Sequence, residues 1–353
     1  MATAPQAPTL ADVARRAGVS RQTVSNAVNN PSLLREETLS RVQAAIDELG
    51  YVPNRAARNL RTGTTRLVGL RYIATPDGTA NTAMDRFVKA LVGAARDAGY
   101  HLMLVADGDD GSETPDPIKG YDDLLRSTAV DAFVVTETFL DQPQTAWLAQ
   151  RRAPFVAFGR PWGEPEARHS WVDVDGAAGV RAATEHLIAR GHQRIWWLGW
   201  SPSNRVDADR RSGWEQAMHA AGLPTDGLVA SAADTVEAAT EAAGAVLDTA
   251  DHRPDAVVCA TDTLGIGVLH ALVARGLRAG TDVGVVGFDD SSAAQIVPPG
   301  LTSVRAPLED VASEIVAALR RLLGPEPVEP TGVLLTPRLV VRGSTDPSDG
   351  PFL

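Results

Sequence analysis

From residue 66 onward, short apolar runs alternate with longer Ala-rich runs, and this alternation limits the possible folds more than any other feature of the chain. The apolar runs have the length of strands, whereas the runs between them have helical length. Strands that alternate with helices form parallel sheets that the helices cover, so the pattern predicts an α/β fold. The expected strands are Leu67–Tyr72, His101–Val105, Ala132–Val135, Phe155–Phe158, Ile195–Leu198, Ala256–Cys259 and Val283–Phe288. The expected helices cover residues 85–98, 176–190, 208–221, 236–249 and 262–275.

The alternating region is about 280 residues long, which is more than one sheet of ordinary size can hold. We therefore expect two lobes, each built around a Rossmann-like parallel sheet. In such a protein a ligand binds between the lobes, at the carboxyl ends of the strands.

The charge of the chain is unevenly distributed. The whole chain has a net charge of −11, but residues 1–63 contain eight arginines and five acidic residues, a local net charge of +3. The remaining residues therefore carry −14. A basic N-terminal module on an acidic body is typical of a protein that meets phosphate groups at one end only.

The N-terminal region predicts two short helices joined by a turn. Thr9 suits an N-cap with Asp12 three residues later, and Gly18 ends the first helix because glycine adopts a positive φ at little cost. Ser20 caps a second helix, Arg21 to Val28. Two short helices around a Gly-Val turn form a helix-turn-helix, whose second helix enters the major groove of DNA. The alternative is a small helical bundle with a solvated polar face.

The polar face of the second helix carries side chains that can read bases. Arg21 can form a forked hydrogen bond with guanine, and Gln22 can pair with adenine. Thr23, Ser25 and Asn29 can bind phosphates or base edges.

A third helix is expected from about Glu36 to Leu49, and Gly50 ends it. A short basic segment, residues 55–61, comes soon afterwards. This segment is compatible with a helix but has no apolar stripe wide enough to fold alone, so we expect it to be marginal in isolation.

Two N-terminal motifs carry a family resemblance. They are Thr-Leu-Ala-Asp-Val-Ala-Arg-Arg-Ala-Gly-Val-Ser-Arg-Gln-Thr-Val-Ser at 9–25 and Glu-Leu-Gly-Tyr-Val-Pro-Asn-Arg-Ala-Ala-Arg-Asn-Leu at 48–60. With them the chain resembles the LacI family of bacterial transcriptional repressors, and the resemblance continues through residues 185–192, 285–290 and 301–304.

The resemblance implies that residues 54–61 form a hinge helix that orders only on operator DNA. Leu60 then matches a leucine that the family wedges between base steps in the minor groove. Ala57 matches a close approach to the groove, while Tyr51 and Asn54 match phosphate and hinge-capping contacts. An ordinary linker role for Leu60 is the alternative. The residues expected to contact DNA are Thr9, Leu10, Ser20, Arg21, Gln22, Thr23, Ser25, Asn26, Asn29, Arg35, Thr38, Tyr51, Asn54, Arg55, Ala57 and Leu60.

One position departs from the family pattern. The family usually caps its third helix with Ser or Thr, but Arg35 occupies that position here, followed by a retained Thr38. Either Arg35 binds a phosphate instead, or Ser32 caps the helix from an extended turn.

The resemblance also implies two periplasmic-binding-protein-like lobes joined by three crossovers, which we place near residues 160–164, 290–293 and 324–328. The expected domains are a disordered tail at 1–8, a headpiece at 9–53, a hinge and linker at 54–63, an effector-binding and dimerisation domain at 64–345, and a tail at 346–353. The N-lobe then comprises about 64–162 and 292–325, and the C-lobe about 163–291 and 326–345.

Several polar and aromatic residues follow the expected strands and should face the cleft between the lobes. Carboxylates and arginine can grip adjacent hydroxyls, while an aromatic ring covers the apolar face of a sugar. In the family, residues that match Arg210, Thr261 and Asp289 commonly hold a sugar or another small effector. The effector-binding candidates are Met84, Asp85, Arg160, Trp162, Arg210, Thr261, Asp262 and Asp289.

Most of these candidates also have a structural interpretation. Asp289 could brace a crossover, and Asp262 could only cap the following helix. Arg210 could pair with Asp207 or Asp209 on the surface, and the adjacent Arg211 leaves the assignment ambiguous by one residue. Trp196 and Trp197 are more typical of core packing, whereas Trp200 lies nearest the end of its strand.

Other function classes find less support in the sequence. The chain contains no phosphate-binding loop of the form Gly-x-x-x-x-Gly-Lys-Ser/Thr. The acidic cluster of Asp107, Asp109, Asp110 and Glu113 lacks the spacing of a metal site. Cys259 is the only cysteine, which agrees with a reducing cytoplasm and with a buried small hydrophobe. A solute-binding protein would need a signal peptide, and a sugar-processing enzyme would need a paired acid and base.

We therefore expect a cytoplasmic, homodimeric repressor of a palindromic operator, without enzymatic activity, metal or cofactor, and with no membrane partner. The effector is expected to be a sugar, with a purine or a phosphorylated sugar as alternatives. No leucine heptad follows Val341, so a dimer rather than a tetramer is expected. The sequence does not fix whether the effector weakens or strengthens DNA binding.

Overall fold

A computed structural model describes residues 8–52, 63–71, 82–105, 116–136, 138, 143–164, 166–200, 204–249, 253–326 and 328–346. The chain separates into two compact units, residues 1–65 and 66–353. Within the described ranges, no helix has the length and apolar character needed to cross a membrane. The expected hinge residues Asn54, Arg55, Ala57 and Leu60 and the acidic cluster at 107–113 lie outside the described residues.

The first unit is a small helical domain. Its helices are α1 (Leu10–Ala17), α2 (Arg21–Asn29), the 3-10 turn η1 (Pro31–Leu33) and α3 (Glu36–Leu49). The apolar stripes of these helices meet in one core, formed by Val13, Ala14, Ala17, Val24, Ala27, Val42, Ala45 and Tyr51. Gly18 and Gly50 end α1 and α3 with φ of 64° and 62°, as the sequence predicts.

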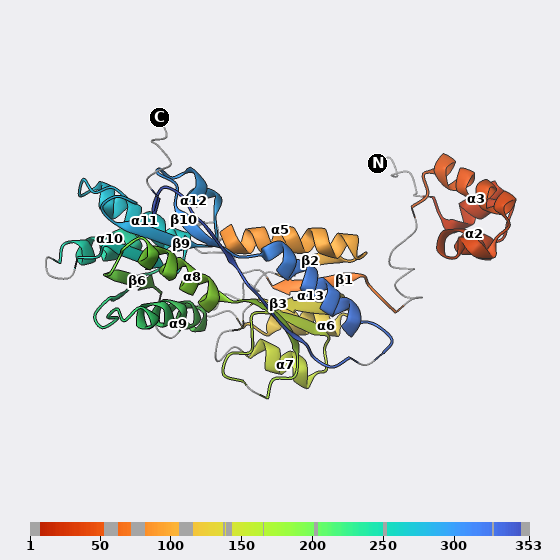
Figure 1. The fold of residues 1–353 in the computed structure, drawn as a ribbon. Helices are drawn as coiled ribbons and strands as arrows, with labels where there is room; N and C mark the ends of the chain where they lie inside the picture. Colours follow the sequence, from red (N-terminus) through yellow and green to blue (C-terminus); the bar gives the residue numbers. More distant parts are fainter. Residues whose placement is uncertain are drawn as a thin grey trace, which may run out of the picture. The chain divides into compact units, whose positions relative to one another are not determined.

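The second unit contains two six-stranded sheets, and each forms the centre of one lobe. The N-lobe sheet has the order β11-β5-β4-β3-β1-β2, and all its pairings are parallel. Its strands are β1 (Leu67–Arg71), β2 (His101–Val105), β3 (Ala132–Val135), β4 (Phe155–Phe158), β5 (Ser170–Val174) and β11 (Gly332–Leu335). In Figure 1, α5 (Thr82–Asp97) and α13 (Leu308–Leu322) lie on one face of this sheet, and α6 (Lys119–Arg126) and α7 (Gln144–Gln150) on the other.

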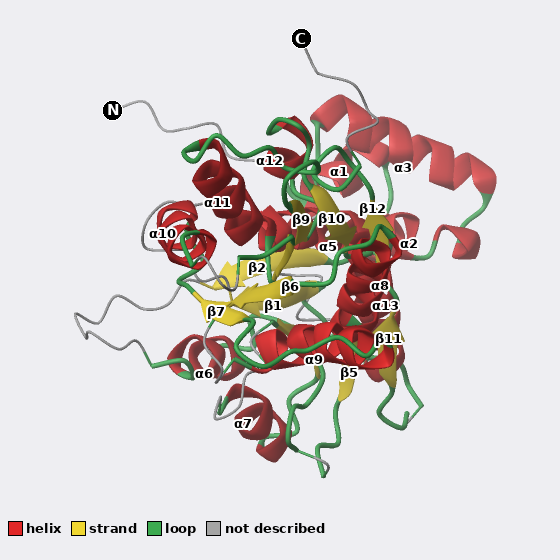
Figure 2. Ribbon diagram, turned by 60° about the vertical axis from the view of Figure 1, so that its left-hand side comes forward, coloured by secondary structure: helices red, strands yellow, loops and turns green. Residues whose placement is uncertain are grey.

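The C-lobe sheet has the order β12-β10-β9-β8-β6-β7, and β12 alone among these pairs antiparallel to its neighbour. Its strands are β6 (Ile195–Gly199), β7 (Val229–Ser231), β8 (Ala256–Cys259), β9 (Gly284–Phe288), β10 (Thr302–Arg305) and β12 (Arg338–Val340). The helices of this lobe are α8 (Gly176–Ala189), α9 (Arg205–Ala220), α10 (Val236–Leu247), α11 (Asp262–Val273) and α12 (Ser292–Ile296). Figure 2 shows helices around the strands of the second unit, so the expected α/β architecture is confirmed.

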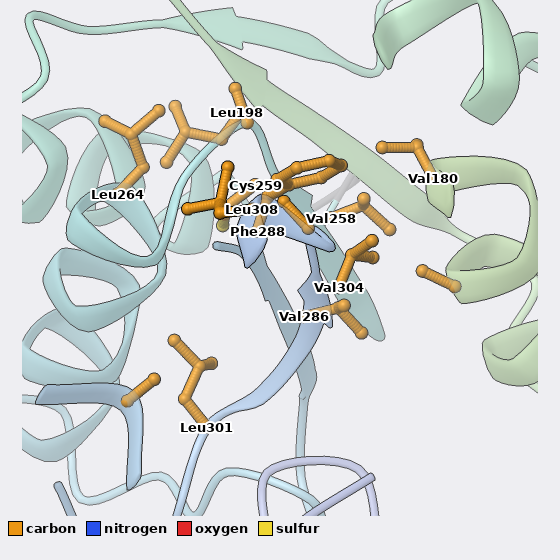
Figure 3. Close-up of a cluster of buried hydrophobic side chains, with 14 of the residues drawn as sticks. Val180, Leu198, Val258, Cys259, Leu264, Val286, Phe288, Leu301, Val304 and Leu308 are labelled. Atoms are coloured by element: carbon orange, nitrogen blue, oxygen red, sulfur yellow. The ribbon is translucent and has the colours of Figure 1, made fainter. Parts of the chain in front are cut away.

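The core of the C-lobe explains why the sequence signal is strong there. Side chains from β6, β8, β9 and β10 pack with Val180 of α8 and Leu264 of α11 (Figure 3). Cys259 is fully buried in this cluster, and burial raises the pKa of its thiol. The cysteine therefore acts as a small hydrophobe, as expected.

The three crossovers lie later than the sequence analysis placed them. The chain leaves the N-lobe sheet after β5, at 174–176, returns after β10, at 305–308, and crosses a third time between β11 and β12, at 335–338. The expected crossovers near 160–164, 290–293 and 324–328 are wrong because a short strand lies between each of them and the true crossing. Of these strands, β5 and β10 contain polar residues and lack the continuous apolar run of a central strand, whereas β11 is a short apolar run that was not among the expected strands.

Candidate functional site

The helix-turn-helix has the geometry that the sequence predicts. Thr9 and Asp12 form a capping box at the start of α1, where the Thr9 amide donates to the Asp12 carboxylate at 2.9 Å. Hydrogen bonds from Thr9 lower the pKa of Asp12. Ser20 caps α2 by accepting a hydrogen bond from the Thr23 amide at 3.1 Å, which fixes the start of the helix that would enter the groove.

The exposed face of α2 carries one arginine that is available for a ligand. Arg21 is exposed and forms no hydrogen bond or ion pair within the described parts of the chain. The Gln22 amide donates to the Asn26 side chain at 3.1 Å, so these two side chains form a connected polar surface. The Asn29 amide donates to the carbonyl oxygen of Ser25 at 2.6 Å and stabilises the last turn. Arg21 and Gln22 are thus the side chains of α2 best placed for base contacts.

Other predicted DNA contacts have a partly structural role. Arg35 is the N-cap of α3 and makes no capping hydrogen bond, and Ser32 lies in η1, so the proposed cap from Ser32 is absent. The exposed Arg35 side chain is compatible with a phosphate contact. Thr38, in the first turn of α3, is half-buried. Tyr51 and Leu10 pack in the core of the first unit, although a phenolic hydroxyl can still reach solvent from such a position.

A cavity of about 240 Å³ lies between the lobes of the second unit. Its walls come from the carboxyl ends of strands in both sheets, including Phe158 and Gly159 after β4, Trp200 after β6 and Asp289 after β9. The starts of α5, α9 and α13 complete the wall. This is where parallel sheets place their ligand sites. The aromatic and long apolar lining residues are Met84, Phe158, Trp162, Trp200, Phe288 and Leu308.

Arg210 is held at the cavity wall by contacts from the C-lobe. Its guanidinium donates to the carbonyl oxygen of Ala260 at 2.5 Å and lies 3.6 Å from the ring centre of Phe288. The guanidinium nitrogen is 3.9 Å from the Asp289 carboxylate. The alternative surface pairing is wrong, because the neighbouring Arg211 makes that kind of contact, with Glu215 at 2.9 Å.

Asp289 presents a carboxylate to the cavity from a constrained backbone. Its φ is 103°, a region that residues other than glycine rarely adopt. Burial raises the pKa of Asp289, and the nearby Arg210 partly offsets this effect. Arg86 of α5 donates to the Asp289 carbonyl oxygen at 2.7 Å, so an N-lobe side chain holds this C-lobe turn in place.

Arg160 supports the cavity wall instead of lining it. Its guanidinium donates to Asp173 at 2.7 Å and to the carbonyl oxygen of Val174 at 3.2 Å, and lies 4.3 Å from the ring centre of Trp162. It also forms an ion pair of 3.5 Å with Asp209 in the C-lobe. Arg160 therefore holds Trp162, Asp173 and Asp209 in position. It does not line the cavity, where we expected it to contact the effector.

Two further candidates do not reach the cavity. Asp262 is buried and accepts hydrogen bonds from the Ser291 amide and the Ser303 hydroxyl, both at 2.6 Å. Burial and the nearby Asp289 raise the pKa of Asp262 to about 7. Asp85 is exposed and does not line the cavity, whereas its neighbour Met84 does.

Thr261 lines the cavity but its hydroxyl is already engaged. It donates to Asp234 at 2.6 Å and accepts from the Leu264 amide at 3.2 Å, where it caps α11. Asp234 follows β7 and also lines the cavity. The sequence analysis missed Asp173 and Asp234, and considered Asp209 only as a partner for Arg210.

Comparison with known proteins identifies the family. Residues 9–54 match the model of the bacterial regulatory proteins of the lacI family, and residues 184–345 match that of the periplasmic binding protein-like domain. The HTH-type transcriptional regulator CelR of Thermobifida fusca is 36% identical over 96% of this chain and 98% of its own length. The chain belongs to the LacI family of bacterial regulatory proteins.

Solved structures of LacI-family proteins have the same architecture. A structure described as a transcriptional regulator CelR–cellobiose complex has a TM-score of 0.70 and 33% identity, and covers 96% of this chain and 99% of its own. The Lac repressor dimer bound to operator and the anti-inducer ONPF has a TM-score of 0.81 and 26% identity, and covers 97% of this chain and 100% of its own. These relatives are transcriptional regulators.

Several polar groups at the cavity wall have no partner within the described parts of the protein. Three buried donors on lining residues have no hydrogen-bond partner among the described residues: the indole nitrogens of Trp162 and Trp200 and Nε of Arg210. An unpaired buried donor costs roughly 1–3 kcal/mol. Trp162 belongs to the N-lobe and the other two to the C-lobe, so a ligand with oxygen acceptors would satisfy both walls.

Proposed function

We propose that this LacI-family regulator is a cytoplasmic repressor, that a homodimer of it binds palindromic operator DNA, and that a sugar in the interlobe cavity controls its affinity for that DNA. The composition of the cavity carries the proposal. Aromatic rings suit the apolar faces of a pyranose, and the Asp289 carboxylate and Arg210 guanidinium suit its hydroxyls. Because cellobiose is the ligand in the CelR complex, a β-linked glucose disaccharide is the first compound to test.

The DNA-binding part of the proposal assigns base contacts to Arg21 and Gln22 and a minor-groove wedge to Leu60. The exposed, uncommitted Arg21 supports the first assignment. The wedge rests on the family motif at 48–60 alone. In this scheme the effector changes the spacing of the lobes and thereby the stability of the hinge segment 54–61, which is a shift between two populated states.

Mobility-shift assays on DNA from upstream of the protein's own gene test the DNA-binding part. Arg21→Ala should weaken operator binding by roughly 10- to 100-fold, because one bidentate base contact is lost, and should leave non-specific DNA binding nearly unchanged. Arg41→Ala is the matched control, since Arg41 is an exposed arginine on α3 outside the reading face. It should weaken operator and non-specific binding by the same small factor. Equal losses for both variants on both DNAs would refute the assignment.

Addition of cellobiose, glucose and other neutral sugars to the same assay tests the effector part. A concentration-dependent change in operator affinity is expected for at least one sugar, and its direction distinguishes an inducer from a corepressor. A response only to a purine would contradict the sugar assignment while leaving the DNA-binding role intact. Recovery of the sugar unchanged after long incubation is expected, whereas its hydrolysis would favour a sugar-processing enzyme.

A further inference from the structure

We infer that the cavity selects uncharged effectors and excludes phosphorylated ones, and that Asp234 at the cavity rim is a specificity-determining contact. The inference rests on the proposed function, since it assumes that the interlobe cavity is the effector site. It goes further by separating neutral sugars from sugar phosphates, two classes that the sequence leaves open.

The first observation is the balance of charges around the cavity. Among the described residues, four carboxyl groups line the wall, and Arg210 is the one lining residue with a cationic side chain. The carboxyl groups belong to Asp173, Asp209, Asp234 and Asp289. A phosphate group would bring further negative charge among them, and like charges at close range in a partly buried site cost several kcal/mol.

The second observation is that the three arginines near the cavity already have oxygen acceptors. Arg86 donates to the Asp289 carbonyl oxygen at 2.7 Å and lies 3.9 Å from the Glu309 carboxylate. Arg160 donates to Asp173 at 2.7 Å and pairs with Asp209 at 3.5 Å. Arg210 is bound to the Ala260 carbonyl oxygen and lies 3.9 Å from Asp289. A phosphate would have to displace a carboxylate from one of these arginines.

The third observation concerns helix N-termini, which are the usual alternative site for an anion. At α8 the Ala177 amide donates to Asp209 at 3.1 Å and the Ala178 amide to Asp175 at 2.9 Å. At α9 the Asn204 side chain accepts from the Val206 amide at 2.9 Å. At α11 the Thr261 hydroxyl accepts from the Leu264 amide at 3.2 Å. Side chains of the protein therefore cap the starts of α8, α9 and α11. The start of α13, which also lines the cavity, has no side-chain cap, but Glu309 and Asp310 in its first turn disfavour an anion there.

Asp234 adds a second hydroxyl acceptor beside Asp289. Thr261 donates to one oxygen of Asp234 at 2.6 Å, which holds the carboxylate at the rim. The two carboxylates are close enough for Asp234 to disfavour the charged form of Asp289. Two adjacent hydroxyls can donate to such a pair, while the indole nitrogens of Trp162 and Trp200 donate to ligand oxygens. A neutral polyhydroxyl ligand meets both requirements, whereas an ionised phosphate group can accept from the indoles but cannot donate to the two carboxylates.

The experiment compares matched neutral and phosphorylated ligands on the full chain. Cellobiose with cellobiose 6′-phosphate, glucose with glucose 6-phosphate, and inosine with its 5′-monophosphate are titrated by calorimetry and by tryptophan emission. In each pair that binds, the phosphorylated member should bind at least about tenfold more weakly. A phosphorylated member that binds as tightly as its neutral partner, or more tightly, overturns the inference, but it leaves the regulator and its effector control in place.

Asp234→Asn tests the specificity residue. The variant should bind the neutral sugar about tenfold more weakly, because a charge-assisted hydrogen bond becomes a neutral one at an exposed rim. It should also reduce the preference for the neutral over the phosphorylated member by a similar factor. Glu237→Gln is the control, since Glu237 is an exposed carboxylate in the first turn of α10 that does not line the cavity. Equal behaviour of the two variants would overturn the role of Asp234 even if the sugar binds and controls DNA affinity.

Discussion

The placement of Asp262 leads to a quantitative prediction for the variant Asp262→Asn. The carboxyl group lies between the Ser291 amide and the Ser303 hydroxyl, away from the cavity wall. Asparagine fits the same position, because its oxygen can accept from the Ser291 amide and its amide can donate to the Ser303 oxygen. The substitution therefore removes the ionisable group with little change in shape.

The sign and size of the effect follow from the pKa of Asp262. Burial raises it from 3.8 to about 7, so the folded state holds the proton more tightly than the unfolded chain does. The resulting stabilisation is complete below about pH 4 and is lost as the pH rises through about 7. A shift of about 3 pKa units corresponds to roughly 4 kcal/mol. Because asparagine stays neutral, the variant should gain up to about 4 kcal/mol in unfolding free energy relative to the native chain between pH 4 and pH 8.

Urea denaturation followed by tryptophan emission measures this difference, because all seven tryptophans lie in the second unit. Asp282→Asn is a control of opposite sign. The Arg278 amide donates to Asp282 at 2.8 Å and lowers its pKa, so this variant should lose stability, relative to the native chain, as the pH rises above the acidic range. If native and Asp262→Asn proteins keep a constant difference from pH 4 to pH 8, the burial argument for Asp262 is refuted.

Three further substitutions test other parts of the structure. Ser20→Ala removes the cap of α2, so the thermal midpoint of the headpiece, measured by circular dichroism, should fall with a loss of about 1 kcal/mol. Gly213→Ala places a Cβ in steric conflict with the Ala177 carbonyl oxygen, so the second unit should lose about 3 kcal/mol or more in urea denaturation. Thr261→Val leaves Asp234 without its hydroxyl donor and should weaken sugar binding in calorimetry, whereas Thr261→Ser should bind as the native chain does.

The sequence predicts the central strands well because their side chains are apolar on both faces. The bounds of the central strands β3, β4 and β8 agree with the expected runs, as do those of the edge strand β2. It does not predict β5 or β10, in which Ser170, Asp173, Thr302 and Ser303 interrupt the apolar pattern. These polar residues are tolerated because tertiary partners satisfy them, as when Ser303 donates to Asp262 at 2.6 Å. The first two crossovers were misplaced for the same reason.

The effector site shows a similar division. Residues that follow a recognisable strand, such as Asp289 and Thr261, do line the cavity. The roles of Arg160 and Asp262 could not be predicted, because they depend on partners 13 to 49 residues away in one case and 29 to 41 in the other. Sequence position alone identifies the end of a strand, but it does not show whether a carboxylate there is already engaged.

In the proposed scheme, specificity and signal transmission use different atoms of the same site. Asp234 lies at the rim and its carboxylate accepts a bond from Thr261, so a change there alters the ligand without disturbing the lobes. Asp289 is followed directly by Asp290, a buried carboxylate paired with Arg342 at 2.5 Å and with Arg305 at 3.2 Å. Arg305 ends β10, where the chain crosses between the lobes at 305–308, and Arg342 follows β12, the first strand after the third crossover. In the proposed scheme, an effector bound to Asp289 lies one peptide unit from these ion pairs. Only contacts that differ between the two arrangements of the lobes can shift the equilibrium between them.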